Sequence, residues 1–363
     1  MGNTLALKAA ILILFSIYIY VAGFSYTALV ANDDFASSVS TYVRIFLLAL
    51  IFLLMGIQGE VKKIQLYFLV FSAFCIITMN PFLIVVAFMI LPGVIFSNFI
   101  NNKKAINTVI GASILSFFSI FLLSYFDIID TKILIDDGEF TLSNLRETFG
   151  FNNPNAASMY IAQILMIAIV YKNKLLSIIL FLFFVWITLA TGSRTPFYAV
   201  VFFLTLLLFS HFHYFNKIIK IGSILFVAIV PFIIKIYISN GIWHLFGFDF
   251  NHILTYRLSI IQNLYHTNGG VNFLPHYSIE FVDSGYANLF LNGGVVFYLL
   301  FLVFCCTYVK YENNNYYLSF FCAFLIILIS ESFITGNLIF SILIVARYIY
   351  LLNFRFFGKL SDV

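Results

Sequence analysis

From Trp186 to Val201 the chain reads WITLATGSRTPFYAVV, and this stretch decides which kind of fold the sequence can form. Apolar runs lie on both sides of a short segment that contains a glycine, a serine, an arginine and a proline. Glycine and proline interrupt helices, and a charge at the centre of a membrane-spanning helix costs about 2.5–3.5 kcal/mol on insertion scales. We therefore expect two membrane-spanning helices that reverse direction near Gly192, with Arg194 at a helix end.

The composition extends this pattern to the whole chain. Hydrophobic residues make up 63% of the 363 positions and charged residues only 9%, and the mean hydropathy is +1.04. A soluble globular protein is excluded, because its apolar fraction would be roughly half. Apolar runs of about 17–25 residues, each long enough to cross the hydrocarbon core as a helix, follow one another with short interruptions. The sequence predicts an all-α polytopic membrane protein with one integral membrane domain over residues 1–363.

Twelve membrane spans are expected, and the basic residues indicate their orientation. With a cytoplasmic N-terminus, the inner side carries thirteen of the nineteen lysines and arginines, and the outer side carries twelve of the fifteen acidic residues. This distribution follows the positive-inside rule and places both termini in the cytoplasm. Two outer loops are long, at residues 127–154 and 240–285. The expected spans are 5–30, 40–57, 64–79, 81–100, 105–126, 155–171, 175–191, 196–214, 218–239, 286–309, 316–333 and 337–354.

Both long loops contain helix signals. The first loop ends in NNPNAA, where Asn153 before Pro154 predicts a helix cap followed by a proline in the first turn. The second loop contains HILTYRLSIIQNLYH, whose apolar residues recur at helical spacing and predict an amphipathic helix along the outer membrane interface. Its apolar stripe is Leu254, Leu258, Ile261 and Tyr265. Neither the four cysteines nor the histidines have metal-ligand spacing, so no metal and no cofactor is expected.

The outer face uses arginine where the inner loops use mainly lysine. A guanidinium is a planar fork of donors that suits bidentate contact with phosphate and keeps its charge when buried. Arg194 can also be read as an interfacial anchor whose charged head meets lipid phosphates. Arg257 can equally be an ordinary charge on an amphipathic helix. We expect Arg44 and Arg347 to pair with acids or carbonyls in the helix bundle, with Glu331 as one candidate partner.

Outside the cytoplasm there is no ATP, so an enzyme that builds a polymer there needs a donor already activated on a lipid, typically a sugar on a polyprenyl pyrophosphate. Breaking the sugar–phosphate bond develops charge on the leaving pyrophosphate, which fixed arginines would stabilise. The acceptor hydroxyl needs a base within hydrogen-bond reach. The stretch PHYSIEFVDSGYANLFLNGG offers His276, Glu280 and Asp283. Asp283 is favoured by its position at the mouth of the tenth span, and His276 by the ordinary chemistry of imidazole near neutral pH.

Three motifs together resemble a known family. TGSRTPF after a helix, RETFGFNNPNAA at the end of an outer loop and FVDSGYANLFLNGGVV at the entry to a late helix are similar to the Wzy-type polymerases of O-antigen and capsular polysaccharide. These belong to the O-antigen ligase and polymerase superfamily. The resemblance covers the pattern of about residues 146–300 and implies a C-type (GT-C-like) glycosyltransferase architecture with two long periplasmic loops. It further implies a bacterial inner-membrane enzyme of lipopolysaccharide or other polysaccharide biosynthesis.

The resemblance also implies an activity and a site. Such an enzyme joins undecaprenyl-pyrophosphate-linked repeat units, and Arg194, Arg257 and Arg146 would bind the pyrophosphate. Its partners would be the lipid-linked glycan donor and acceptor, membrane lipids and a chain-length regulator protein, with no nucleic acid. The family's ligases usually carry a His-Asn pair before the late helix, where this chain has Asp283-Ser284; this favours a polymerase. An O-antigen ligase and a lipid-linked oligosaccharide flippase or other transporter remain the alternatives.

Overall fold

The chain forms two compact units. The first unit contains residues 1–66, 91–201 and 337–363, and the second contains residues 67–90 and 202–336. Both units include apolar helices, and the single membrane domain expected from the sequence stays a prediction. The computed structural model describes residues 2–59, 61–129, 132–134, 145–210, 212, 214–245, 247–253, 257–277, 282–329, 331 and 339–357.

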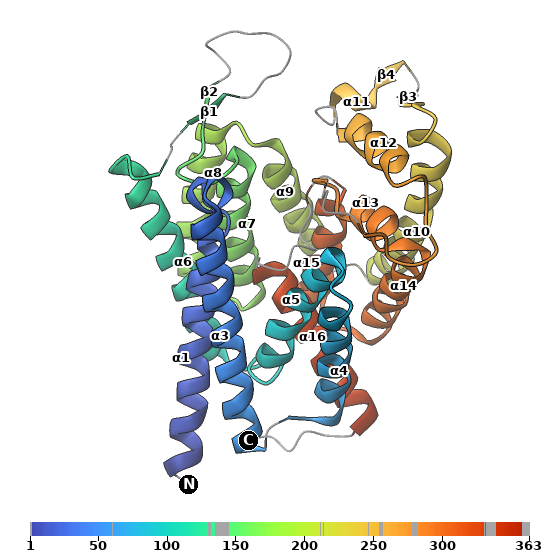
Figure 1. Cartoon of the computed structure of the whole chain (residues 1–363). Helices are drawn as coiled ribbons and strands as arrows, with labels where there is room; N and C mark the ends of the chain where they lie inside the picture. Colours follow the sequence, from blue (N-terminus) through green and yellow to red (C-terminus); the bar gives the residue numbers. More distant parts are fainter. Residues whose placement is uncertain are drawn as a thin grey trace. The chain divides into compact units, whose positions relative to one another are not determined.

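Twelve apolar helices dominate the described part of the chain (Figure 1). Seven are long and apolar enough to cross a membrane: α1 (Gly2–Phe24), α3 (Asp34–Gln58), α6 (Lys103–Tyr125), α8 (Lys174–Thr191), α10 (Phe215–Ile233), α14 (Gly294–Tyr311) and α16 (Ile339–Phe357). Five are shorter: α4 (Lys63–Ile77), α5 (Pro81–Phe96), α7 (Pro154–Val170), α9 (Arg194–Phe209) and α15 (Asn315–Ile327). The chain is therefore a helical multi-pass membrane protein, as the composition predicts. Because the five short helices have only 13 to 17 residues, the number of twelve crossings stays a prediction.

Short elements occupy the connections. Two pairs of antiparallel strands lie in the long loops, with Ile133 opposite Arg146 in one pair and His244 opposite Asp249 in the other. The strands are β1 (Lys132–Leu134), β2 (Leu145–Glu147), β3 (His244–Leu245) and β4 (Phe248–Asp249). The short helices are α2 (Ala28–Asn32), α11 (Phe250–Ile253), α12 (Arg257–Thr267) and α13 (Gly285–Ala287). Two π-helical turns, η2 (Ile234–Ile238) and η3 (Asn288–Asn292), follow α10 and α13.

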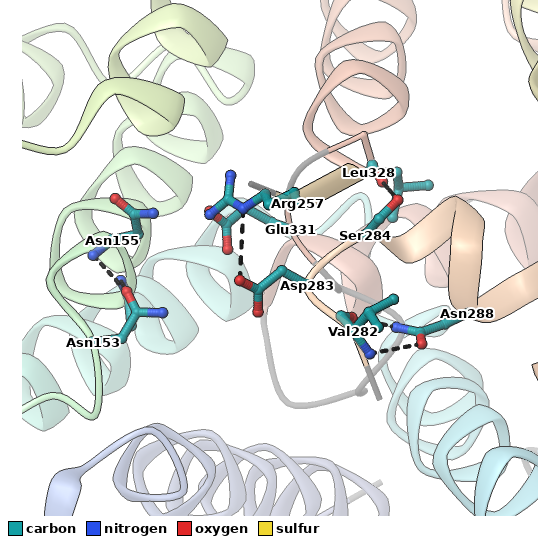
Figure 2. A network of polar contacts seen from close by, with 10 residues as sticks. Asn153, Asn155, Arg257, Val282, Asp283, Ser284, Asn288, Leu328 and Glu331 are labelled. Carbon is teal, nitrogen blue, oxygen red and sulfur yellow. Dashed lines mark hydrogen bonds and ion pairs between the residues drawn. The ribbon is translucent and has the colours of Figure 1, made fainter. Parts of the chain in front are cut away.

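Local chemistry places the ends of these helices. The Asn153 side-chain oxygen accepts hydrogen bonds from the backbone N–H groups of Asn155 at 2.7 Å and Ala156 at 3.3 Å, which confirms the predicted cap of α7 (Figure 2). Helix α8 ends at Gly192, the glycine between the seventh and eighth expected spans, whose φ of 62° is a conformation that residues with a Cβ rarely adopt. The predicted reversal between Thr191 and Arg194 is therefore made by a left-handed glycine, and α9 begins at Arg194.

Helix α7 lies in the core of the first unit. Fourteen of its seventeen residues are buried, as expected of a helix that is apolar all round. It packs against α8, and α1 packs against α3 and α6 (Figure 1). A Cβ on Gly23 of α1 would lie 2.1 Å from the Ser116 hydroxyl oxygen and 2.6 Å from the Tyr160 hydroxyl oxygen. Only a glycine lets α1 approach α6 and α7 this closely.

One predicted element differs from the sequence-based expectation, and another is described only in part. The amphipathic helix of the second loop is described from Arg257 to Thr267 as α12, which buries Ile261 and Leu264, and Tyr265 of the predicted stripe is half-buried. Leu254 of that stripe lies outside the described residues. The expected tenth span is not one helix, because α13, η3 and α14 divide it. The break falls at Gly293 and Gly294, where Gly294 has a φ of 73°, and hydropathy alone does not show such a change of main-chain direction.

Candidate functional site

Arg257 lies between two carboxylates in the second unit. At the first position of α12, its Nε atom is 3.6 Å from Oδ2 of Asp283, and its Nη2 atom donates a hydrogen bond of 3.2 Å to Oε1 of Glu331 (Figure 2). The side chains of Arg257 and Glu331 are only 12% and 14% exposed, whereas that of Asp283 is 56% exposed. We call these three residues the Arg257 cluster. It has one side chain accessible from solution and two that are largely covered.

The backbone on either side of Asp283 is held firmly. The Asn288 side chain clamps Val282: its Nδ2 atom donates to the Val282 carbonyl at 2.6 Å and its Oδ1 atom accepts from the Val282 N–H at 3.1 Å. On the other side, the Ser284 hydroxyl donates to the Leu328 carbonyl at 3.4 Å (Figure 2). The Asp283 carboxylate therefore projects from a main chain that is hydrogen-bonded on both sides, and rotation of the side chain alone can move it without breaking those bonds.

The same contacts bring Glu331 to the cluster. The carbonyl of Leu328, at the end of α15, also accepts from the backbone N–H of Tyr286 at 3.3 Å, and the Glu331 N–H donates to Ile327 at 2.9 Å. The segment around Asp283 and the turn after α15 are thus joined by hydrogen bonds. As a result, the two carboxylates reach Arg257 from parts of the chain that are far apart in sequence.

Buried amides connect the entry of the late helix to this region. The Asn268 amide donates to Oδ1 of Asn292 at 3.0 Å, and the Asn292 amide donates to Oδ1 of Asn288 at 3.3 Å. Asn288 and Asn292 begin and end η3, and all three asparagines are buried. Satisfied polar networks of this kind rigidify their surroundings, and π-helical turns are frequent at functional sites. The network supports the position of Asn288 and therefore that of Val282 and Asp283.

The glycine pair of the LNGG motif is explained by close packing. Gly294 has a φ of 73°, and a Cβ there would lie 2.6 Å from the carbonyl oxygen of Leu274 and 2.9 Å from that of Asn272. The N–H of Val295 donates to that Asn272 carbonyl at 3.0 Å. The motif therefore joins the loop before the late helix to the helix itself, and any side chain at position 294 would separate them.

His276 is held by its backbone rather than by its ring. Its N–H donates to the Asn292 carbonyl at 2.8 Å, and its carbonyl accepts from the Asn80 side chain at 3.2 Å. The residue as a whole is half-buried. The imidazole is thus attached to an ordered main chain near η3, within the same unit as the Arg257 cluster. Glu280, the remaining candidate base, lies outside the described residues.

The first unit presents a second cationic position at the start of α9. The Ser193 hydroxyl donates to the Pro154 carbonyl at 3.1 Å and accepts from the Thr191 hydroxyl at 2.8 Å. These bonds join the turn before α9 to the start of α7, so the two helices begin side by side. Neither α7 nor α9 has an acid in its first turn, and Arg194, the first residue of α9, is exposed. Two helix N-termini and one arginine together make this end of the first unit favourable for an anion.

Arg146 is in β2, opposite Ile133 of β1. Of the six predicted site residues, the structure brings only Arg257 and Asp283 into contact within the described part of the chain. Arg194 and Arg146 belong to the first unit, and Arg257, His276 and Asp283 to the second. The two units thus hold different members of the predicted site.

Glu331 has a partner that the sequence did not indicate. Arg44 and Arg347 were the expected candidates, and the structure pairs Glu331 with Arg257. Arg44 instead donates through Nε to the Ser40 carbonyl at 3.2 Å and through Nη2 to the Thr41 hydroxyl at 3.1 Å. The expectation that Arg44 would meet carbonyls of the bundle is confirmed. A long arginine side chain within a helix finds its nearest acceptors one turn earlier on the same helix.

Several contributors to the site carry no signal of their own in the sequence. Glu331 follows an apolar run and is separated from Arg257 by 74 positions. Asn288, which holds Val282, lies within the FVDSGYANLFLNGGVV motif and Asn268, which binds Asn292, lies before it, but residue type alone assigns neither a role. Neither a protein-family model, nor a curated protein, nor a solved structure matches this chain.

Proposed function

We propose that this protein is a polysaccharide polymerase, a glycosyltransferase that joins undecaprenyl-pyrophosphate-linked oligosaccharide repeat units into O-antigen or capsular polysaccharide. The contact between Arg257 and Asp283 carries this proposal. It places a cation suited to a phosphate leaving group next to a carboxylate suited to accept a proton from a sugar hydroxyl. The same proposal includes twelve spans, a GT-C-like architecture and cytoplasmic termini in the bacterial inner membrane. They are supported by the twelve apolar helices and by the distribution of lysine and arginine.

The chemistry requires one displacement at the anomeric carbon of the donor sugar. The acceptor hydroxyl oxygen forms a bond to that carbon with its electron pair, and the carbon–oxygen bond to the pyrophosphate breaks. The electron pair of that bond leaves with undecaprenyl pyrophosphate, and the hydroxyl proton passes to a protein carboxylate, which is Asp283 in this proposal. Fixed cations lower the barrier because they stabilise the charge that develops on the leaving group.

Arg194 supports the proposal independently. The first residue of a helix is an unfavourable place for a cation, because the helix dipole is positive there. An exposed arginine at the start of α9, with the start of α7 bonded to it through Ser193 and Pro154, concentrates positive charge where no described acid of either first turn offsets it. We infer that this position contacts a pyrophosphate, either of the donor or of the acceptor. Arg146, in β2, remains the third and weaker member of this set.

The proposed orientation predicts the labelling of single cysteines. In a variant without Cys75, Cys305, Cys306 and Cys322, Thr267→Cys at the end of α12 is expected to react with an impermeant thiol reagent in intact spheroplasts. Asn101→Cys, between α5 and α6, is expected to react only after the membrane is permeabilised. Both positions are exposed, so side-chain burial does not limit either reaction. Labelling of Asn101→Cys in intact spheroplasts would reverse the orientation and remove the basis for an outward-facing site.

The activity is tested with purified protein in liposomes that contain the undecaprenyl-pyrophosphate-linked repeat unit. We expect a ladder of lipid-linked products with several repeats, and Arg194→Lys is expected to slow its formation about 10- to 100-fold. Lysine keeps the charge but loses the fork, and a lost hydrogen bond to a charged group costs about 1.5–3 kcal/mol. The rate is read from the ladder by gel electrophoresis over time.

Arg355→Lys is the matched control, because Arg355 is exposed in the last turn of α16, away from the start of α9 in the chain. Its rate is expected to equal that of the unaltered protein. A normal rate for Arg194→Lys would return Arg194 to the role of an interfacial anchor. Folded protein that leaves every substrate at one repeat would contradict the proposed function itself.

A further inference from the structure

The Arg257 cluster, as the structure shows it, does not attract an anion. One guanidinium faces two carboxylates, so the three side chains carry a net negative charge when all are ionised. A pyrophosphate that approached this cluster would meet repulsion unless one carboxylate moved away. An arginine that binds the leaving group at this position must therefore exchange a protein carboxylate for a phosphate.

The geometry distinguishes the two carboxylates. Glu331 is 14% exposed and its oxygen is within hydrogen-bond distance of Arg257, at 3.2 Å. Removing such a covered partner leaves a buried charge uncompensated and is strongly unfavourable. Asp283 is 56% exposed, and its distance of 3.6 Å from Nε is an ion pair without a good hydrogen bond. Ion pairs with an exposed member are weak, typically about 0.2–1 kcal/mol. Asp283 is the exchangeable partner.

The fixed main chain lets Asp283 leave without disturbing the fold. Val282 and Ser284 stay bonded to Asn288 and Leu328 whichever way the Asp283 side chain turns. A rotation about the side-chain bonds alone takes the carboxylate away from Nε. Glu331 meanwhile keeps its hydrogen bond to Nη2 and so holds the guanidinium in place for the incoming phosphate.

We propose that the pyrophosphate of the lipid-linked donor displaces Asp283 from Arg257, and that this displacement releases the Asp283 carboxylate to accept the proton of the acceptor hydroxyl. Glu331 is a positioning residue that stays on Arg257 in both states. A carboxylate beside a guanidinium is less available to a hydroxyl than one that has been released from it. Donor binding thus prepares the base, and the acceptor is not activated while the donor site is empty. This inference rests on the proposed function and specifies how its site is regulated.

Binding of radiolabelled undecaprenyl pyrophosphate to the full-length protein in phosphatidylcholine nanodiscs tests the exchange without any transfer of sugar. Asp283→Asn is expected to bind about two- to five-fold more tightly than the unaltered protein, which corresponds to removing a competitor worth about 0.4–1 kcal/mol. In the Arg257→Gln background the same change is expected to have less than about a two-fold effect, since no guanidinium remains to compete for. Asp249→Asn, which removes an acid of the same unit paired with His244 instead, is expected to leave the affinity unchanged.

Equal tightening by Asp283→Asn with and without Arg257 would show simple charge repulsion and overturn the exchange. So would weaker binding by Asp283→Asn in protein that elutes and melts as the unaltered chain does; Asp283→Ala repeats the measurement if the asparagine variant is unstable. A structure of the pyrophosphate complex decides which acid moves: Asp283 away from Nε with Glu331 still on Nη2 supports the proposal, and the reverse overturns it. Tightening that depends on Arg257, in a protein that makes no polymer, would uphold the exchange and refute the polymerase.

Discussion

A bacterial strain that lacks this chain is expected to display glycan of a single repeat unit on its lipid acceptor, with every longer chain missing. The reason is that translocation, polymerisation and ligation are separate reactions. Translocation delivers single lipid-linked repeats to the outer face, and ligation transfers lipid-linked chains of any length to the final acceptor. Under the proposed function, only the displacement assigned to Arg257 and Asp283 joins one repeat to the next. The measurement is the surface-glycan ladder, separated by gel electrophoresis and detected with an antibody or a stain for sugars.

Complementation from a plasmid is expected to restore the ladder and serves as the control. Two other outcomes would point to the alternative functions. Long chains that accumulate on the carrier lipid, with none on the final acceptor, would identify the chain as a ligase. The absence of even single repeats at the surface would favour a flippase or other transporter. Either result would remove the polymerase proposal.

Asp283→Asn is expected to lower the rate of chain growth by about 10²- to 10⁴-fold, the usual contribution of a positioned general base. Asparagine keeps the size of the side chain and its ability to hydrogen-bond, but it cannot take the proton of the acceptor hydroxyl. Val282 and Ser284 are held through Asn288 and Leu328, so the substitution leaves the main chain supported. The rate is measured with the purified protein and the lipid-linked repeat, alongside donor binding, which should be retained and tighter than in the unaltered protein.

His276→Ala is the sharpest comparison, because the hydrogen bonds of His276 to Asn292 and Asn80 are made by its backbone and survive the change. A loss of activity in this variant would therefore report on the imidazole itself. If His276→Ala stops chain growth and Asp283→Asn does not, the base is His276. Normal growth in both variants would leave neither residue as the base, and Glu280 would be the next to test.

The sequence alone determined that this is a helical membrane protein with many apolar helices. Hydropathy is a local property that depends on composition within a window of about 20 residues, so it identifies membrane helices without knowledge of packing. Helix ends were predictable for the same reason. Asn153 caps α7 through bonds to the next two or three residues, and Gly192 ends α8 through its own backbone conformation. Each of these signals is contained within four consecutive residues.

The tertiary structure decided which charged residues form pairs. The sequence indicated Arg257 and Asp283 as candidates but left Arg257 equivalent to Arg194, and it named only Arg44 and Arg347 as candidate partners of Glu331. In the folded chain Arg257 is paired with two acids, whereas Arg194 begins a helix whose first turn has none. Pairing depends on distances of a few ångströms between residues up to 74 positions apart. Coulombic attraction is strong only at such short range, and the order of residue types along the chain does not show which distant charges come that close.

The π-helical turn and its asparagines also required the fold. The sequence predicted one late helix over residues 286–309, and the structure divides it into three elements. The buried amides of Asn288 and Asn292 need partners, and they find them in Asn268 and in the backbone of Val282. Hydrophobic periodicity determined which segments are helices, whereas the satisfaction of buried polar groups by distant ones determined how Asp283 is presented to Arg257.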